Sequence, residues 1–239
     1  MVYFKHMDFP QKIAEIKNTV KTICAEAGTD ADKVIIVAAV KTRSADDVCR
    51  LKGLINDIGE NRVQEFNEHY LEVVCGAETF KWHFIGRLQT NKVKYLIEKD
   101  VLIHSLDREE LAAEINRLSL KHGVITECLA EINIADEPSK GGILFDDTEN
   151  FLKSLENYQN IKIKGIMSVL PAITPEEGLD EYYIKLGGLY ERIKKLSIKN
   201  LDCKYLSAGM SNDYRTALKY GANIIRLGTS IFGPRDYTL

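Results

Sequence analysis

The sequence has no apolar run long enough to cross a membrane, and its opening residues, MVYFKHMDFPQK, contain no stretch of signal-peptide length. Its five cysteines lie far apart, with an odd count and no C-x-x-C pair. Such scattered thiols suit a reducing compartment better than a disulfide framework or a zinc site. We therefore expect a cytoplasmic protein without a metal site. The cysteines are Cys24, Cys49, Cys75, Cys128 and Cys203.

An excess of basic residues is also missing. The chain has 32 lysines and arginines against 35 aspartates and glutamates, for a formal net charge of −3. It offers no broad positive field, so we expect neither nucleic acid nor a membrane as a partner. The 239 residues contain no Pro/Gly/Ser-rich linker, low-complexity tract or internal repeat. With 45% hydrophobic and 28% charged residues an ordinary core can form, and we interpret residues 1–239 as a single domain.

The sequence does contain an alternation of short strand patterns with longer helical patterns. Apolar residues recur at helical spacing, as in Leu111, Ile115 and Leu118, and an additional amphipathic helix with an apolar face between Ile13 and Ile23 precedes the first strand. This order predicts an α/β fold, a (β/α)₈ TIM barrel with an extra N-terminal helix. A doubly wound open sheet is the alternative, because periodicity does not reveal closure, although no dinucleotide fingerprint follows the first strand. The candidate strands are residues 34–40, 56–59 (a weak pattern), 82–86, 101–106, 127–134, 161–170, 203–210 and 223–232.

The first strand, VIIVAAV, runs directly into Lys41. Active sites of such barrels form at the carboxyl ends of the strands. Val37 and Ala39 share the face of Lys41, so an inward orientation of that face would place the amine at the barrel mouth. Partial desolvation there lowers the pKa of a lysine and favours the neutral amine that attacks a carbonyl. The alternative is a lysine at a strand end that extends into solvent.

Two loops near the end of the chain have features of an anion site. Ser211 follows the seventh strand, and Gly228 and Thr229 follow the core of the eighth. In barrels of this type the loops after the last two strands often bind phosphate. Gly228 would let the main chain approach an anion closely, and the hydroxyls of Ser211 and Thr229 can donate to phosphate oxygens.

Arg226 shares a strand face with Gly228, so both face the barrel mouth if Gly228 does. A buried guanidinium needs an acceptor. That acceptor is either a carboxylate such as Glu131 or a ligand whose ring or anion accepts the bond. A lysine for an aldehyde, a cup for a phosphate and an arginine for a ring acceptor together describe pyridoxal 5′-phosphate (PLP).

Seven ordered motifs resemble the pyridoxal phosphate homeostasis protein family, the single-domain relatives of the alanine racemase barrel. They are AAVKTRSADDV, GENRVQEF, WHFIGRLQTNK, INIADEPSKGGI, IKGIMSVLP, LSAGMSNDY and IIRLGTSIFGPR. The resemblance covers nearly the whole chain, from the first strand to Arg235. It implies a fold-type III PLP barrel with PLP as the cofactor.

The resemblance also implies which residues contact PLP. Lys41 would hold it covalently as an internal aldimine. The remaining contacts, in chain order, are Asn61 in the pocket, Met210 at the edge of the cofactor, Ser211 at the phosphate, Arg226 at the pyridine nitrogen, and Gly228 and Thr229 at the phosphate.

The chain departs from the family pattern at three positions. Val40 stands where the family commonly has Ser, Arg62 where it often has Tyr, and Ala208 where it often has Met. None of these removes a cofactor contact, but Arg62 changes what meets the open face of the site.

Two features favour a carrier over an enzyme. Racemases and decarboxylases that resemble this barrel carry a second, β-rich domain that lends a catalytic tyrosine, whereas this sequence ends soon after the eighth strand. Arg226 opposite the pyridine nitrogen would keep that nitrogen unprotonated and weaken the ring as an electron sink. We therefore expect a monomer without catalytic residues that stores PLP or delivers it to apo-enzymes.

Two other functions remain open at this point. One is a PLP-dependent amino-acid racemase whose site a partner chain completes. The other is a cofactor-free aldolase whose Lys41 forms a Schiff base with a sugar phosphate. His83 resembles a catalytic residue in isolation, but we expect a packing role for a histidine on a barrel strand.

Overall fold

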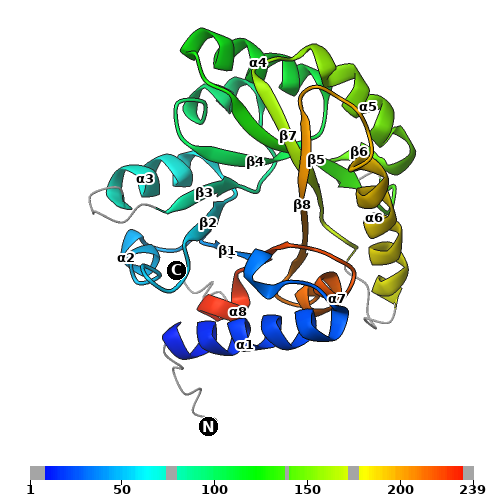
Figure 1. Cartoon of the computed structure of the whole chain (residues 1–239). Coiled ribbons are helices and arrows are strands. Elements are labelled where there is room, and N and C mark those ends of the chain that lie inside the picture. The colour runs from blue at the N-terminus through cyan, green and yellow to red at the C-terminus, as the bar shows by residue number, and fades with distance from the viewer. Residues whose placement is uncertain (1–8, 74–79, 138–139, 172–177, 234–239) are drawn as a thin grey trace.

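Parallel strands close into a barrel in the computed structural model of the protein, which describes residues 9–73, 80–137, 140–171 and 178–233 (Figure 1). The strands pair in sequence order around the ring, and the last strand returns to pair with the first. The predicted (β/α)₈ barrel is therefore confirmed, and the open sheet is wrong. The strands of the ring are β1 (Ile35–Ala39), β2 (Asp57–Glu60), β3 (Lys81–Phe84), β4 (Val101–Leu106), β5 (Thr126–Asn133), β7 (Ile161–Ser168), β8 (Leu201–Met210) and β9 (Ile224–Leu227).

Helices follow the strands and form the outer layer, and the two-residue strand β6 (Ile143–Leu144) pairs with β5 outside the ring. In α4 the three apolar residues Leu111, Ile115 and Leu118 are buried, as their helical spacing predicts. The α-helices are α1 (Phe9–Ala27), α2 (Ala45–Cys49), α3 (Val63–Val73), α4 (Glu109–His122), α5 (Thr148–Ser154), α6 (Leu179–Ile193), α7 (Tyr214–Lys219) and α8 (Thr229–Phe232). The 3₁₀ helices are η1 (Ala31–Lys33), η2 (Thr90–Tyr95), η3 (Phe145–Asp147) and η4 (Leu155–Asn157).

Two apolar clusters hold these layers together. The larger one lies between the strands and the helices. The smaller one fills the interior of the barrel and takes one buried residue from each of five strands: Val37, Leu102, Leu129, Met167 and Ile224. Burial of an aliphatic side chain of this size contributes about 1.5–3 kcal/mol. Because strand residues alternate between the two clusters, Val37 in the inner cluster fixes which face of β1 points into the barrel.

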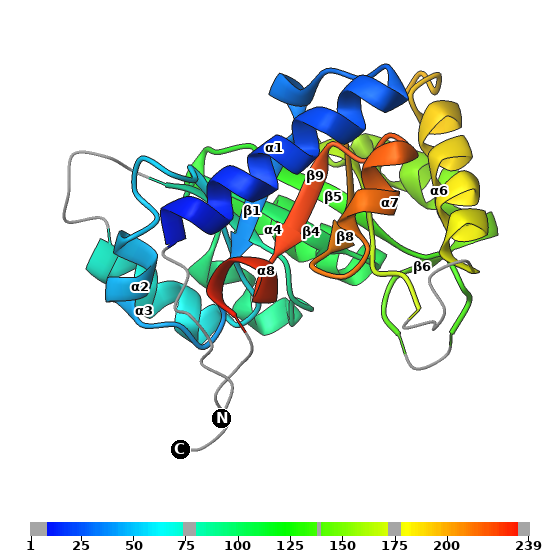
Figure 2. The same ribbon diagram turned by 90° about the horizontal axis from the view of Figure 1, so that it is seen from below.

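The N-terminal helix is also confirmed. The residues on the apolar face of α1 that begins at Ile13 and ends at Ile23 are buried. α1 packs against α7 and α8 (Figure 2), and the rings of Phe9 and Phe232 meet edge-on at 5.4 Å between centroids. The extra helix therefore covers the barrel where the first and last strands pair.

The prediction of a strand over residues 223–232 is wrong in its second half. β9 ends at Leu227, and α8 follows at once. The amides of Ile231 and Phe232 both donate to the carbonyl of Gly228, at 3.1 and 2.9 Å. These bonds turn the backbone into a helix although the sequence Thr-Ser-Ile-Phe is compatible with a strand.

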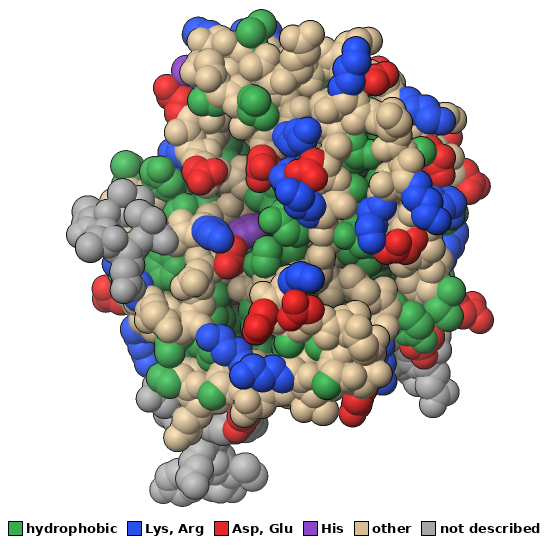
Figure 3. Space-filling view, in the orientation of Figure 1, with side chains coloured by type: hydrophobic (Ala, Val, Ile, Leu, Met, Phe, Trp, Pro, Cys, Tyr) green, Lys and Arg blue, Asp and Glu red, His purple; other side chains and the backbone are tan. Residues whose placement is uncertain are grey.

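Charges of both signs are interspersed on the face seen in Figure 1, as Figure 3 shows. This distribution agrees with the nearly balanced charge of the sequence. In the ranges that the structure describes, no helix combines the length and the hydrophobicity that a membrane span needs. Cys75 lies outside the described residues.

Candidate functional site

Lys41 lies just beyond the carboxyl end of β1, at the mouth of the barrel, and is half-buried. Ala39 faces inward, like Val37 two residues before it. A Cβ atom placed on Gly228 would lie 3.7 Å from the Cβ of Ala39, so the ends of β1 and β9 meet at this mouth. The structure thus brings Lys41 and Gly228 to the same end of the same pair of strands.

The turn after Lys41 is held by α3. Thr42 has a left-handed backbone (φ 62°), and its amide donates to Oε2 of Glu65 at 3.1 Å. The ring of His69 bridges Oε1 of Glu60 (2.5 Å) and the carbonyl of Arg43 (2.9 Å). The hydrogen bond to Glu60 raises the pKa of His69, and burial raises the pKa of Glu60. This pair could not be predicted from the sequence, because Glu60 and His69 belong to different elements.

Ser211 joins the two loops that the sequence predicted as an anion site. Its Oγ accepts hydrogen bonds from the amides of Gly228 and Ser230, both at 3.2 Å. Because the oxygen serves as an acceptor here, its own proton remains available to a ligand. Thr229 begins α8 between these two amides. The three predicted phosphate residues therefore lie together, at the ends of β8 and β9.

Arg226 is buried inside the barrel, with 5% of its surface exposed. Nη1 donates to Oγ of Ser207 at 2.6 Å, and Nη2 donates to the carbonyl of Ser168 at 2.9 Å. Both acceptors are neutral, so these bonds do not form the ion pair with Glu131 that the sequence left open. Burial lowers the pKa of Arg226.

Glu131 is a second titratable group near Arg226. The pKa of its carboxyl is raised to about 7: burial is the main cause, the charge of Asp107 adds to the rise, and the charges of Arg226 and Arg87 oppose it. The sequence suggested Glu131 only as a salt-bridge partner. The effect of the Arg226 charge on this β5 residue could not be predicted from the sequence, because it depends on closure of the ring.

Asn61 follows β2 and Met210 ends β8, with β1 and β9 between these two strands in the ring. Oδ1 of Asn61 is buried and has no hydrogen-bond partner among the described residues. The residue lines a cavity of about 850 Å³ with several cationic side chains, namely Arg62, Arg87, Lys92 and Arg108. Met210 ends β8 with 42% of its surface exposed. A ligand in the mouth could therefore contact both, and the orphaned oxygen of Asn61 needs a donor.

His83 lies away from the mouth, beside residues at the amino ends of the strands. Its Nδ1 is 2.8 Å from Nε2 of His104, and its Nε2 is 3.0 Å from Oδ1 of Asp57. Both ring nitrogens have partners, which agrees with the packing role that the sequence suggested. Across the described ranges, no three His, Cys, Asp or Glu side chains gather in a way that could hold a metal ion.

Comparison with known proteins places the chain in a family. A family model described as alanine racemase, N-terminal domain, matches residues 12–236. A pyridoxal phosphate homeostasis protein of Aquifex aeolicus is 36% identical over 236 residues, which span 97% of this chain and 100% of the relative. The chain belongs to the pyridoxal phosphate homeostasis protein family. The resemblance of the seven motifs is thereby confirmed.

Solved structures agree with this family membership. A crystal structure of an unknown protein from Bifidobacterium adolescentis is 26% identical, covers 94% of each chain and superposes with a TM-score of 0.86. PipY of Synechococcus elongatus, solved without PLP, is 25% identical, covers 90% of this chain and 100% of PipY, and has a TM-score of 0.79. A second PipY structure, with PLP bound, is 24% identical with the same coverage and a TM-score of 0.77, and it supports the fold alone.

Proposed function

We propose that this member of the pyridoxal phosphate homeostasis protein family binds PLP at the carboxyl-terminal mouth of its barrel. Lys41 would hold the cofactor covalently as a Schiff base, and the protein would store or deliver PLP with little or no turnover. The observation that carries the proposal is the convergence at one mouth of Lys41, a buried arginine and a loop pair joined by Ser211. The name of the Aquifex aeolicus relative supports the same ligand.

The residues present fit PLP. Oδ1 of Asn61 is buried without a partner among the described residues, and so can accept a bond from a ligand. Gly228 has no side chain where β1 and β9 meet, which leaves room for a phosphate beside the Ser211 hydroxyl and Thr229. Arg226 would face the pyridine nitrogen and Met210 the edge of the ring. When bound, PLP supplies a reactive aldehyde.

The environment of Arg226 supports a carrier over an enzyme. A guanidinium donates and keeps its proton, so the pyridine nitrogen opposite it stays unprotonated. A neutral pyridine withdraws electrons weakly, which makes chemistry through a carbanion slow. We assign no catalytic residue. The PLP-dependent racemase is the second candidate, because Glu131, with a pKa of about 7, could exchange protons near the site.

The absorption spectrum tests the ligand and the covalent link. A Schiff base between Lys41 and PLP absorbs visible light, so the loaded protein should be yellow and Lys41→Ala should lose the band. Lys33→Ala is the matched control, because Lys33 flanks the other end of β1 and is exposed. A colourless wild-type protein after incubation with PLP would overturn the proposal and favour the cofactor-free aldolase.

Turnover separates the carrier from the racemase. Racemisation and transamination should be measured on the loaded protein with all common amino acids. We expect rates far below the enzyme median of about 10 s⁻¹. A rate near that median for any amino acid would establish the racemase.

We further propose that the protein acts as a monomer in the cytoplasm and passes PLP to apo-enzymes. The scattered cysteines support a reducing compartment. Light scattering of the loaded protein should give the mass of one chain. Incubation with a cofactor-free PLP enzyme should restore that enzyme's activity faster than free PLP at the same concentration, and equal rates would exclude direct transfer.

A further inference from the structure

Arg226 is the first member of a row of hydrogen-bonded side chains that crosses the barrel interior. Its Nη1 donates to Oγ of Ser207 at 2.6 Å, and that oxygen is 3.0 Å from Nδ1 of His104. Nε2 of His104 is 2.8 Å from Nδ1 of His83, whose Nε2 is 3.0 Å from Oδ1 of Asp57. The row therefore takes one residue from each of β9, β8, β4, β3 and β2. Every member except Asp57 is buried.

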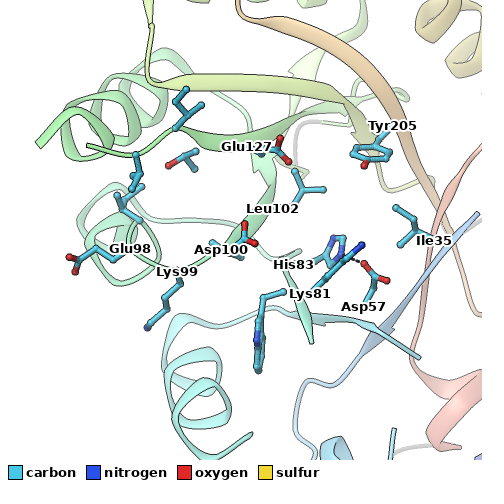
Figure 4. Close-up of a pocket in the computed structure, with 16 residues that line it drawn as sticks. Ile35, Asp57, Lys81, His83, Glu98, Lys99, Asp100, Leu102, Glu127 and Tyr205 are labelled. Atoms are coloured by element: carbon cyan, nitrogen blue, oxygen red, sulfur yellow. Dashed lines mark hydrogen bonds and ion pairs between the residues drawn. The ribbon is translucent and has the colours of Figure 1, made fainter. Parts of the chain in front are cut away.

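Asp57 ends the row at the opposite face of the barrel. It lies at the start of β2, beside a pocket of about 470 Å³ formed by the amino ends of the strands. Figure 4 shows the bond from His83 to Asp57 at the edge of this pocket, next to Lys81. The side chain of Asp57 is 15% exposed, so the row connects the arginine below the mouth with solvent on the far side.

The chemistry of the two ends gives the row a direction. A guanidinium only donates and a carboxylate only accepts. Oγ of Ser207 accepts from Arg226, which leaves its hydroxyl proton for Nδ1 of His104. Nε2–H of His104 then donates to Nδ1 of His83, and Nε2–H of His83 donates to Asp57. With both histidines neutral, the reverse direction would place a bare ring nitrogen of His83 against the carboxylate of Asp57, so only one direction satisfies every contact.

The surroundings favour a neutral His104. Burial lowers its pKa well below the ordinary value, and the positive charge of Arg226 acts in the same direction. A neutral imidazole is the form that accepts at Nδ1 and donates at Nε2 at the same time. Hydrogen bonds in series polarise one another, so the carboxylate of Asp57 acts on Arg226 through three intervening side chains.

We propose that this row of hydrogen bonds, which runs in one direction, positions Arg226. It thereby couples the cofactor end of the barrel to the opposite face of the barrel. Its members are positioning residues, since none touches the mouth: Ser207, His104, His83 and Asp57. The direction of the chain stands independently of any ligand. Its effect on a pyridine nitrogen rests on the proposed function.

Histidine tautomers in the cofactor-free protein test the direction. Nitrogen-15 NMR at pH 7 distinguishes protonated from bare ring nitrogens, and His83→Gln and His104→Gln assign the signals by their loss. We expect both rings to be neutral, with the proton on Nε2. A proton on Nδ1 of His104, or a cationic ring at either position, would contradict the proposed direction of the hydrogen bonds. This result does not depend on whether the protein binds PLP.

Serine-to-alanine substitutions test the coupling between the row and the PLP site. Ser207→Ala removes an acceptor from Arg226, and we expect PLP to bind about tenfold more weakly, with a shifted visible absorption maximum. Ser105→Ala is the matched control. Ser105 is buried like Ser207 but lies on β4, and its hydroxyl has no partner in the described part of the chain. PLP affinity and spectrum unchanged in Ser207→Ala, or equally changed in Ser105→Ala, would refute the coupling.

Substitutions in the pocket at the amino ends of the strands test the Asp57 end of the hydrogen-bonded row. Asp57→Asn retains an acceptor oxygen but removes the charge, and should shift the same absorption maximum by less than Ser207→Ala does. Asp100→Asn removes a carboxylate from the same pocket outside the chain and should leave the spectrum unchanged. If both aspartate variants shift the absorption maximum equally, charge in the pocket affects the cofactor without the row. If neither variant shifts it, Asp57 has no effect on the site. Either result would contradict the coupling. A wild-type protein that fails to bind PLP would contradict the proposed function and leave the NMR result to decide the chain.

Discussion

Replacing Gly228 by alanine should separate binding from folding. Gly228 has φ −110° and ψ −75°, a conformation open to residues with a side chain. An added Cβ would lie 3.7 Å from both Cβ and the carbonyl oxygen of Ala39, which is ordinary van der Waals contact. Alanine restricts the unfolded chain more than glycine does. The free energy of unfolding should therefore change by no more than about 1 kcal/mol.

The same methyl group should interfere with PLP. It would stand in the mouth between Ala39 and the loop after β9, beside the Ser211 hydroxyl. A phosphate could then no longer approach the backbone of this loop closely. Loss of one or two charge-assisted hydrogen bonds corresponds to about 1.5–3 kcal/mol, so the dissociation constant for PLP should rise about 10- to 100-fold.

Two measurements decide this prediction. Urea denaturation gives the stability of Gly228→Ala, and titration of the visible band gives its PLP affinity. Gly209→Ala is the contrasting variant: Gly209 has φ 93°, and its Cβ would lie 2.6 Å from Cβ of Ala217 and 2.9 Å from Cα of Tyr214. It should lose more than about 2 kcal/mol of stability. Normal PLP affinity in a well-folded Gly228→Ala would refute the assignment of this loop to the phosphate.

Two further predictions concern pH. Glu60 raises the pKa of His69 in the folded state, so the stability that His69 contributes is complete below its unfolded value of 6.5 and is lost as the pH rises through the folded value. In urea denaturation His69→Gln should be about 1.5–3 kcal/mol less stable than the wild type at pH 6 and closer to it at pH 9; a constant difference would contradict this. The pKa of Glu131 is raised from 4.5 to about 7, so the stability linked to its proton is present below pH 4.5 and lost through pH 7. As the pH rises from 5 to 8, the free energy of unfolding of Glu131→Gln should increase relative to that of the wild type by on the order of 1–3 kcal/mol. An unchanged difference would show that the carboxyl ionises in the folded protein without loss of stability.

Local patterns sufficed for most of the barrel. The short β-rich run VLIHSL and the helical spacing of Leu111, Ile115 and Leu118 are properties of neighbouring residues, and the structure follows them. The end of β9 was missed because Thr229–Phe232 suits a strand and a helix equally. Bonds to the Gly228 carbonyl and to Ser211, which lies in the loop after β8, decide the helix.

The placement of Lys41, Ser211 and Gly228 at one mouth could be predicted because each follows the carboxyl end of a strand, and parallel strands end at the same face. Their roles toward PLP stay predictions. The Glu60–His69 pair and the partners of Arg226 could not be predicted. They join residues whose separation along the chain says nothing about their distance.

The order of strands and helices, the family, and a lysine, an arginine and a loop pair suited to PLP can all be read from the amino-acid sequence. That Arg226 bonds Ser207 and Ser168 instead of a carboxylate, and that its hydrogen bonds continue to Asp57, became visible in the folded barrel. Closure of the ring accounts for this difference. Which side chains meet across the barrel depends on strand register around the whole ring, and a contact of about 3 Å tolerates no error in that register.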